Sequence, residues 1–331
     1  MYKKLKIGLV IPAYNEERLL KPTLDNVPQT VDIIIVVDDC STDNMPQVLK
    51  NHMMNDKRIV GIKHKKNKGV GQGIITGYKE AVKQGCDVAV VIGGDNQMDL
   101  MDLSNFLEPI HKNEADYVKG NRFMFDHAMK YQGTEDGSAF KVMPRQRFFG
   151  NSVLSFIAKW ASGYWNIFDT QDGYTAITKA AIQRVDWEKA WKGYGYVGDW
   201  FSLFNVYNLR IKDVPRKAVY LKGERQSQIK LGRYIRTVLP RMVKSFFWRI
   251  KTKYIYQDFH PLILFYILGL LLLPIGMILG LYLLLKWLIF FGNIDISGTK
   301  AILTALFIIT GIQSIFFAVW FDMEANKHLQ N

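Results

Sequence analysis

The sequence predicts an α/β fold in which a Rossmann-like, mostly parallel sheet is followed by basic amphipathic helices and two transmembrane helices. Apolar strands and polar helices alternate from residue 6 onward, which is typical of βαβ units. Two of the strands run into acidic residues, at Asp38 and Asp95. Two uncharged apolar segments near the end of the 331-residue chain are each long enough to cross a bilayer.

The alternation is clearest in the first part of the chain. The expected elements, in order, are a strand over 7–11, a helix from about 16, a strand ending at 38, a helix from about 42, a strand over 58–62, a helix over 71–83 and a strand ending near 92. A further strand over 116–120 precedes Arg122. Because parallel strands need crossover connections, these elements predict a mostly parallel sheet.

Acidic side chains stand at the carboxyl ends of two predicted strands. A β-branched strand ends on Asp38 and Asp39 and is followed by Ser41, which favours a helix start. A second strand ends near Asp95. Open α/β sheets bind ligands at this edge, so the two acidic ends suit a nucleotide base or ribose at one and a metal-bound diphosphate at the other.

The two apolar segments cover residues 262–285 and 301–321 and contain no charged side chain. Hydrophobicity on every face is unusual for a helix in a soluble domain of this size, so we predict two transmembrane helices. The alternative is a pair of buried core helices. Gly276 and Gly280 are spaced for close helix contact, which in a homo-oligomer could join subunits.

The formal net charge of +13 is concentrated before the first apolar segment. Nine Lys or Arg and no Asp or Glu occur from Arg225 to Lys253. Such a segment favours the cytoplasmic side, so we expect an integral membrane protein with its N-terminal domain and both termini in the cytoplasm. Nucleic acid could also attract this charge, but no recognition motif accompanies it, so the expected partner is membrane lipid and not nucleic acid.

Apolar residues recur at helical spacing among basic ones between 235 and 250. This pattern predicts a helix in the membrane interface, which Pro240 should kink or divide. The alternative is a helix packed on the domain core. We expect a globular domain over 1–228, basic juxtamembrane helices over 229–258, and two membrane helices with a short tail over 259–331.

Four motifs follow the predicted strands in order, and each of them alone is common. They are Pro12-Ala-Tyr-Asn-Glu16, Asp38-Asp-Cys-Ser-Thr-Asp43, Asn67-Lys-Gly-Val-Gly-Gln-Gly73 and Gly94-Asp-Asn-Gln-Met-Asp99. Together they resemble the GT-A family 2 glycosyltransferases. Four later segments resemble the polyprenyl-phosphate (dolichol-phosphate) hexose synthases of that family; they are Gly120-Asn-Arg-Phe123, Asp169-Thr-Gln-Asp-Gly-Tyr174, Tyr196-Val-Gly-Asp199 and Arg225-Gln-Ser-Gln-Ile-Lys230.

The resemblance implies an inverting, metal-dependent hexosyltransferase that moves a sugar from a nucleotide donor to polyprenyl or dolichyl phosphate at the cytoplasmic membrane face. Asp38 or Asp39 would hydrogen-bond the base and ribose, although Asp39 could instead only cap the next helix. The implied nucleotide-sugar site contains Pro12, Tyr14, Glu16, Asp38, Asp39, Lys68, Gly69, Asp95 and Asn96.

The resemblance also implies a site for Mg²⁺ or Mn²⁺. Asp95 and Gln97 match the metal motif, and both carry the oxygen atoms that hard cations prefer. The Asp that commonly stands two places before Asp95 is Gly93 here, so one expected carboxylate is missing. Asp99 could compensate through a water molecule.

The implied acceptor or phosphate site contains Arg122, Arg145, Asp169, Gln171, Ser227 and Lys230. A guanidinium such as that of Arg122 suits two phosphate oxygens at once, although a surface ion pair is the alternative. Arg145 could equally have no contact with the acceptor phosphate, and the alternative for Lys230 is a solvated face.

Asp199 is expected to orient the acceptor or the metal, because a phosphate acceptor is already anionic and needs no base. It would act as a base only toward a hydroxyl acceptor. The expected catalytic residues are thus Asp95, Asp199 and Arg122. His64 and the other histidines show no ligand spacing, and we expect no role for them.

The segment Asp169-Thr-Gln171 resembles the glucose-transferring branch slightly more than the mannose branch, so UDP-glucose is favoured over GDP-mannose as the donor. Two alternatives remain. The acceptor could be a hydroxyl of a lipid-linked saccharide or a glycolipid. The chain could also be a non-catalytic membrane scaffold that binds nucleotide sugar, which Gly93 would favour.

Overall fold

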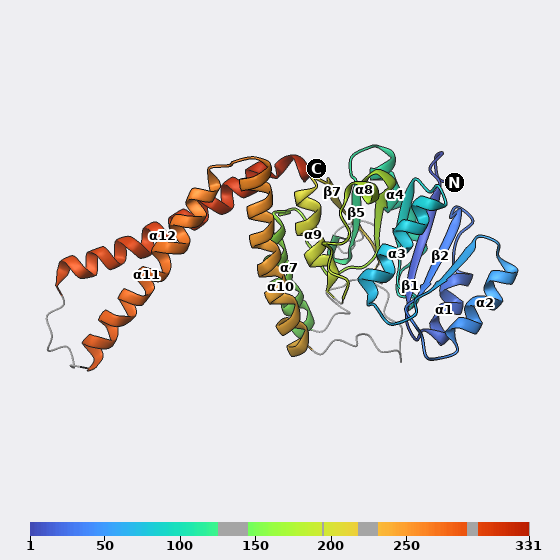
Figure 1. The fold of residues 1–331 in the computed structure, drawn as a ribbon, viewed down its shortest axis with the longest axis horizontal. Helices are drawn as coiled ribbons and strands as arrows, with labels where there is room; N and C mark the ends of the chain where they lie inside the picture. The colour runs from blue at the N-terminus through green and yellow to red at the C-terminus, as the bar shows by residue number, and fades with distance from the viewer. Residues whose placement is uncertain (125–144, 194, 218–230, 290–296, 331) are drawn as a thin grey trace, which may run out of the picture. The chain divides into compact units, whose positions relative to one another are not determined.

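The computed structural model describes residues 1–124, 145–193, 195–217, 231–289 and 297–330 (Figure 1). The chain divides into two compact units, Met1–Phe246 with His328–Asn331, and Phe247–Lys327. The first unit is an α/β domain, and the second contains two long apolar helices. The fold class predicted from the sequence is therefore confirmed. The junction between the units falls between the boundaries expected at 228 and 258.

Seven strands form one sheet in the order β3-β2-β1-β4-β6-β5-β7. They are β1 (Ile7–Ala13), β2 (Ile33–Asp38), β3 (Ile59–Lys63), β4 (Val88–Val91), β5 (Tyr117–Asn121), β6 (Thr175–Thr178) and β7 (Ile211–Pro215). Every neighbouring pair is parallel except the two made by β6, which runs antiparallel to β4 and β5. The carboxyl ends of β1, β2 and β4 therefore share one edge of the sheet.

Helices cover both faces of this sheet. In chain order they are α1 (Glu17–Asp25), α2 (Met45–Asn55), α3 (Val70–Lys83), α4 (Leu103–His111), α7 (Arg145–Ser162), α8 (Lys179–Arg184) and α9 (Tyr196–Val206). Leu9 of β1 shares a buried core with Leu20 of α1 and Phe106 of α4. The next residue, Val10, faces α3 at Gly77. Because strand side chains alternate between faces, burial on both explains the nearly continuous apolar runs.

The helix expected from about residue 42 begins later, at Met45. The backbone N–H of Ser41 donates to Oδ1 of Asp38 at 2.7 Å, and that of Thr42 donates to Oδ1 of Asn15 at 2.8 Å. These bonds give the segment a turn conformation that competes with the helix. The turn after β2 is thereby tied to the turn after β1.

The basic segment forms one helix, α10 (Leu231–Lys251), followed by a π-helical turn over Thr252–Gln257. The helix runs through Pro240, so it is not divided there. Val238 and Met242 are buried, whereas Val243 and Phe247 are exposed. One face of α10 is therefore packed and another is exposed, and its place in the membrane interface stays a prediction.

The two apolar helices are α11 (Leu262–Ile289) and α12 (Gly298–Ala325). Only 28% and 22% of their most apolar windows are buried, which argues against core helices and favours helices that cross a bilayer. They pack closely on each other. A Cβ atom on Gly311 would lie 2.6 Å from the backbone N of Leu273, and one on Gly276 would lie 2.9 Å from that of Ile308. These glycines make contacts within the chain.

A buried ion pair closes the open end of this helical hairpin. Arg249 donates from Nη1 and Nη2 to the two carboxylate oxygens of Asp322, both at 2.8 Å. The hydroxyl of Tyr254 donates to the same carboxylate at 2.6 Å, and Lys253 donates to Oδ1 of Asn326 at 2.8 Å. Since a buried charge is costly unless it is paired, these contacts fix the end of α12 against the segment that precedes α11.

Gly77 provides a test of the contact between α3 and β1. A Cβ atom there would lie 2.1 Å from Cγ1 of Val10, so Gly77→Ala should lower the free energy of unfolding by about 1–3 kcal/mol through overpacking. Gly150→Ala in α7 is the matched control. Its Cβ would meet nothing within 4 Å, so it should stabilise the helix by up to about 1 kcal/mol. Equal changes in the free energy of unfolding for the two variants, measured by chemical unfolding, would contradict the close contact between α3 and β1.

Candidate functional site

The turns after β1 and β2 lie against each other at the carboxyl edge of the sheet. Asn15 has a positive φ of 57°, and its backbone N–H donates to Oγ of Ser41 at 3.0 Å. This brings the predicted donor residues Pro12, Tyr14 and Glu16 beside the turn that follows Asp38. Tyr14 is 44% exposed, so its ring is available to a ligand at this edge.

Asp39 organises the glycine-rich turn before α3. Its Oδ1 accepts from the backbone N–H of Lys68 at 2.8 Å, and its Oδ2 accepts from that of Gly69 at 2.7 Å. Nδ1 of His64 lies 2.7 Å from Oδ1, and Nε2 of the same ring lies 3.0 Å from Oγ1 of Thr76. The expectation that His64 has no role is therefore wrong, because it orients Asp39. The carboxylate of Asp39 does not cap its own following helix.

Asp38 differs from Asp39 in the hydrogen bonds that its carboxylate accepts. Its Oδ1 accepts from the N–H of Ser41, but its Oδ2 is buried and accepts no hydrogen bond from the described residues. Nζ of Lys63 lies 3.7 Å from that oxygen, at ion-pair distance. Buried polar atoms normally have a partner, so Oδ2 of Asp38 is an acceptor available to a ligand. The structure thus separates the two carboxylates that the sequence left equivalent.

Asp95 lies in the turn after β4, next to the turn after β1. A Cβ atom on Gly94 would lie 3.2 Å from that of Ala13, and Oγ1 of Thr23 donates to the carbonyl of Gly94 at 3.2 Å. Burial raises the pKa of Asp95 above its ordinary value. The turn continues through Asn96, which has a positive φ of 53°. Asp95 and Asn96 are thereby placed near the predicted donor residues of β1.

The structure gives a physical reason for Gly93. A Cβ atom there would lie 2.7 Å from Oδ1 of Asp95, closer than real side chains approach. The same Oδ1 accepts from the N–H of Gln97 at 3.3 Å, so the carboxylate is folded back over the turn. A glycine at 93 therefore makes room for the carboxylate of Asp95. Asp99 accepts from the N–H of Met101 at 2.9 Å and caps the short 3₁₀ helix Leu100–Asp102.

A cation would find few protein ligands at this edge. Within the described ranges, no three His, Cys, Asp or Glu side chains come close enough to hold a metal ion together. Asp95 and the amide oxygen of Gln97 are two oxygen donors in one turn, which fits a hard cation that takes its other ligands from water and diphosphate. The carboxylate of Asp95 is partly buried, and a cation would offset the cost of that partial burial.

Two of the predicted acceptor residues, Arg122 and Asp169, belong to a buried ionic network beyond β5. Arg122 donates from Nε and Nη2 to the carboxylate of Asp169, at 2.6 and 2.8 Å. Burial alone would raise the pKa of Asp169, but the charge of Arg122 holds it well below its ordinary value. Arg216, which the sequence did not single out, pairs with Asp172 and also donates to the carbonyl of Gln97 at 3.3 Å. The network thus supports the turn that carries Asp95.

Arg122 is 11% exposed and shares its charge with Asp169, so the structure favours a supporting role over direct phosphate contact. Gln171 is partly exposed, and its Nε2 donates to Oγ1 of Thr170 at 3.2 Å. Ser227 and Lys230 lie outside the described residues. Arg145 is the first residue of α7, and its side chain also lies outside the described part of the chain.

Asp199 is 4% exposed and lies in the first turn of α9. Its Oδ1 accepts from Nε of Arg241 at 2.8 Å and from Oγ of Ser245. Its Oδ2 accepts from the backbone N–H of Trp191 at 3.1 Å. Both carboxylate oxygens therefore already accept hydrogen bonds, so Asp199 is unsuited to act as a general base.

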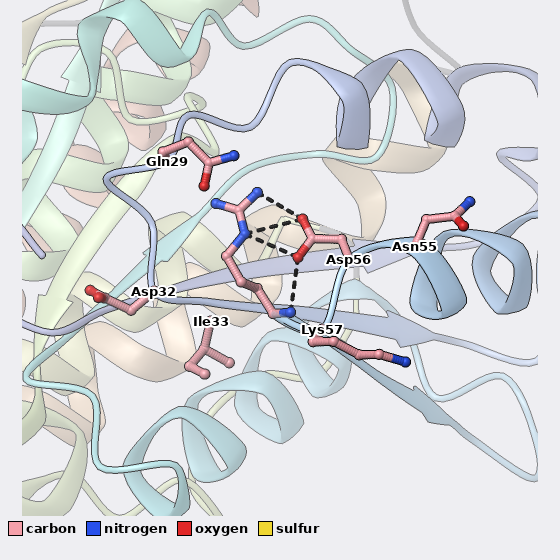
Figure 2. Close-up of a pocket in the computed structure, with 7 residues that line it drawn as sticks. Gln29, Asp32, Ile33, Asn55, Asp56 and Lys57 are labelled. Carbon is pink, nitrogen blue, oxygen red and sulfur yellow. Dashed lines mark hydrogen bonds and ion pairs between the residues drawn. The ribbon is translucent and has the colours of Figure 1, made fainter.

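A hollow of about 510 Å³ lies at the opposite, amino-terminal edge of β2 and β3 (Figure 2). Its lining includes Asp32, Ile33, Asp56 and Arg58. The guanidinium of Arg58 is bound to the carboxylate of Asp56 and also donates to two backbone carbonyls. Its charge is therefore neutralised within the protein, and this hollow is a weaker candidate site than the carboxyl edge.

Residues 9–186 match the model of the family described as "Glycosyl transferase family 2". A UDP-N-acetylglucosamine–dolichyl-phosphate N-acetylglucosaminyltransferase of Methanococcus voltae is 33% identical over 227 residues, which are 65% of this chain and 86% of the relative. An undecaprenyl-phosphate mannosyltransferase of Micrococcus luteus is 26% identical over 64% of this chain and 82% of the relative.

The fold is also found in glucosyl-3-phosphoglycerate synthase from Mycobacterium tuberculosis, solved in complex with Mn²⁺, UDP and glucosyl-3-phosphoglycerate. The two structures superpose with a TM-score of 0.51 at 16% identity, over 73% of this chain and 80% of the other. This likeness supports the shared architecture of the sheet.

The buried Arg122–Asp169 pair predicts a pH-dependent stability. Replacing Arg122 with Met removes the guanidinium that pairs with the buried carboxylate of Asp169, which should lower the free energy of unfolding by about 3–5 kcal/mol near neutral pH. Because Asp169 has a lowered pKa in the folded protein, its contribution is present above the unfolded value of about 3.9 and is lost as the pH falls. The difference in the free energy of unfolding between wild type and the Arg122→Met variant should therefore become smaller in acid.

Arg210→Met is the matched control for this variant. Arg210 also binds an aspartate, Asp116, through Nε and Nη2, but its side chain is 30% exposed. An exposed pair contributes about 0–1 kcal/mol, so urea unfolding should show a much smaller loss. Equal losses for the two arginine variants would contradict the importance of burial.

Proposed function

The chain belongs to glycosyl transferase family 2, and from this premise we propose that it transfers a hexose from a nucleotide sugar to polyprenyl or dolichyl phosphate. The observation that carries the proposal is the placement of the buried carboxylate of Asp38 and the partly buried carboxylate of Asp95 at the carboxyl edge of the sheet. Relatives named for dolichyl-phosphate and undecaprenyl-phosphate acceptors support the lipid, as do the two apolar helices.

On the donor side, Oδ2 of Asp38 would accept a hydrogen bond from the base or the ribose. Asp39 would act indirectly, because its oxygens already hold the turn at Lys68 and Gly69. Lys65 and Lys66 are exposed in the same turn and would attract the diphosphate. Pro12, Tyr14, Glu16 and Asn96 would complete the donor site.

The transfer would proceed by direct displacement. An oxygen of the lipid phosphate forms a bond to the anomeric carbon while the bond from that carbon to the diphosphate oxygen breaks. The nucleoside diphosphate leaves with the electron pair, and the configuration inverts. The attacking phosphate is already anionic, so no protein base is required. The committed oxygens of Asp199 agree with this scheme and disfavour a hydroxyl acceptor.

A divalent cation, Mg²⁺ or Mn²⁺, would neutralise the charge that develops on the leaving diphosphate. Asp95 and Gln97 would hold it, and the network of Arg216 would fix the turn that carries them. With one carboxylate in place of two, the cation would depend on the diphosphate for much of its binding. The cation should therefore bind more tightly when the nucleoside diphosphate is bound than when it is absent.

The donor sugar stays a prediction. The segment at Asp169 favours UDP-glucose over GDP-mannose, whereas the relative of 33% identity is named for UDP-N-acetylglucosamine.

The nine basic residues before the first apolar helix support a cytoplasmic catalytic domain with both termini on the same side. A homo-oligomer likewise stays a prediction.

The first test combines a donor panel with one variant. Detergent-purified protein should transfer label from UDP-glucose, UDP-N-acetylglucosamine or GDP-mannose to polyprenyl phosphate, giving a product that partitions into organic solvent and disappears with a chelator. Asp95→Asn should lower the rate at least about 100-fold, because the cation loses its carboxylate ligand. Near-normal transfer by this variant would contradict the metal site.

Nucleotide binding without product from any donor would contradict the lipid-phosphate acceptor. The panel would then be repeated with a lipid-linked saccharide. Continued absence of transfer would support the scaffold alternative.

The exposed face of α10 generates a second test. Arg236 and Lys244 are exposed there, and each basic residue near an anionic membrane contributes about 1 kcal/mol to attraction. Reversing both charges with glutamate should raise the KM for polyprenyl phosphate about tenfold or more in anionic vesicles. Neutral vesicles are the control and should show a much smaller change. An equal change in both would argue against an interfacial helix.

A further inference from the structure

Two residues of the basic helix α10, Arg241 and Ser245, bind the same carboxylate of the domain, that of Asp199. Arg241 binds Asp199 from Nε at 2.8 Å and from Nη2 at 3.4 Å, and Ser245, one turn later, donates to Oδ1. The guanidinium also lies 5.4 Å from the ring centre of Trp191, at the distance of a cation–π contact. Asp199 and Trp191 therefore form the binding site for Arg241.

The segment that begins at Trp191 also holds the glycine-rich turn. Oδ2 of Asp199 accepts from the N–H of Trp191, and the next carbonyl, that of Lys192, accepts from the N–H of Gln72 at 3.2 Å. A Cβ atom on Gly69 would lie 2.6 Å from that carbonyl oxygen, and one on Gly71 would lie 2.8 Å from that of Trp191. The first turn of α3 is thus in direct contact with this segment.

These contacts form a continuous path between α10 and the donor site. From Arg241 it passes to Asp199, to the segment 191–192, to the turn at Gly69 and then to Asp39, which accepts from the N–H of Gly69 at 2.7 Å. Each step is a hydrogen bond, an ion pair or a close backbone contact.

We propose that Asp199 is a positioning residue that couples the docking of α10 to the conformation of the glycine-rich turn, and hence to nucleotide affinity. When Arg241 occupies Asp199, the 191–192 segment is held against α3 and the turn presents its backbone to the donor. Loss of Arg241 frees the segment and loosens the turn. The basic, lipid-facing helix and the donor site then respond to each other. The inference rests on the proposed donor site but on no particular acceptor.

The experiment measures the affinity of the full-length protein in detergent for UDP and for GDP, by calorimetry, with and without Mg²⁺. The nucleotide that wild type binds more tightly is the probe. Arg241→Ala and Asp199→Asn should each raise its Kd by about fivefold or more, the lower end of typical allosteric coupling. Combining them should add little, because both break the same contact.

Two milder variants keep the test informative if Arg241→Ala or Asp199→Asn fails to fold. Arg241→Lys keeps the charge but not the paired geometry, and Ser245→Ala removes one bond to Asp199, so each should raise the Kd by a smaller factor than Arg241→Ala. Lys251→Ala is the matched control, because Lys251 is an exposed basic residue on the same helix and the variant should leave the Kd unchanged.

A lower unfolding temperature with unchanged nucleotide Kd would show that the Arg241–Asp199 pair is only structural and would overturn the proposal. A higher KM for lipid acceptor with unchanged nucleotide Kd would also overturn it. Failure of every donor and acceptor to give product, with the Kd changes intact, would remove the proposed reaction and leave this coupling standing.

Discussion

The carboxylate of Asp39 is the interaction on which the ligand-binding edge depends. It accepts two backbone N–H groups from the glycine-rich turn and contacts the ring of His64. Hydrogen bonds to a charged group each contribute about 1.5–3 kcal/mol, so this turn is held firmly. Asp39 is used in this way, whereas Oδ2 of Asp38 accepts no hydrogen bond from the part of the chain that the structure describes. Under the proposed function, Asp38 would therefore be the carboxylate that faces the donor.

The turn after β4 is likewise held in place by contacts around one carboxylate, that of Asp95. Asp95 folds back over Gly93, which leaves no room for a side chain there, and Arg216 ties the neighbouring Gln97 to the buried network. One carboxylate in a well-supported turn can hold a cation when the diphosphate supplies further oxygens. The missing aspartate is therefore compatible with a metal-assisted reaction.

The strands and their carboxyl-edge motifs could be predicted because β-branched runs and acidic ends are local patterns. The contacts that decide each residue's role could not. His64 lies 25 positions from Asp39, Arg241 lies 42 positions from Asp199, and Arg249 lies 73 positions from Asp322. Tertiary packing creates such pairs, and helical or strand periodicity carries no signal of them. The late start of α2 has the same origin, since Asn15 belongs to another turn.

The measurement that tests the account most directly is a crystal structure of the protein with Mn²⁺ and its preferred nucleoside diphosphate, with the metal located by anomalous scattering. The account predicts the metal on the carboxylate of Asp95 and on diphosphate oxygens, and a hydrogen bond from the base or ribose to Oδ2 of Asp38. A metal bound away from Asp95, or a nucleotide that leaves Asp38 without a contact, would contradict it.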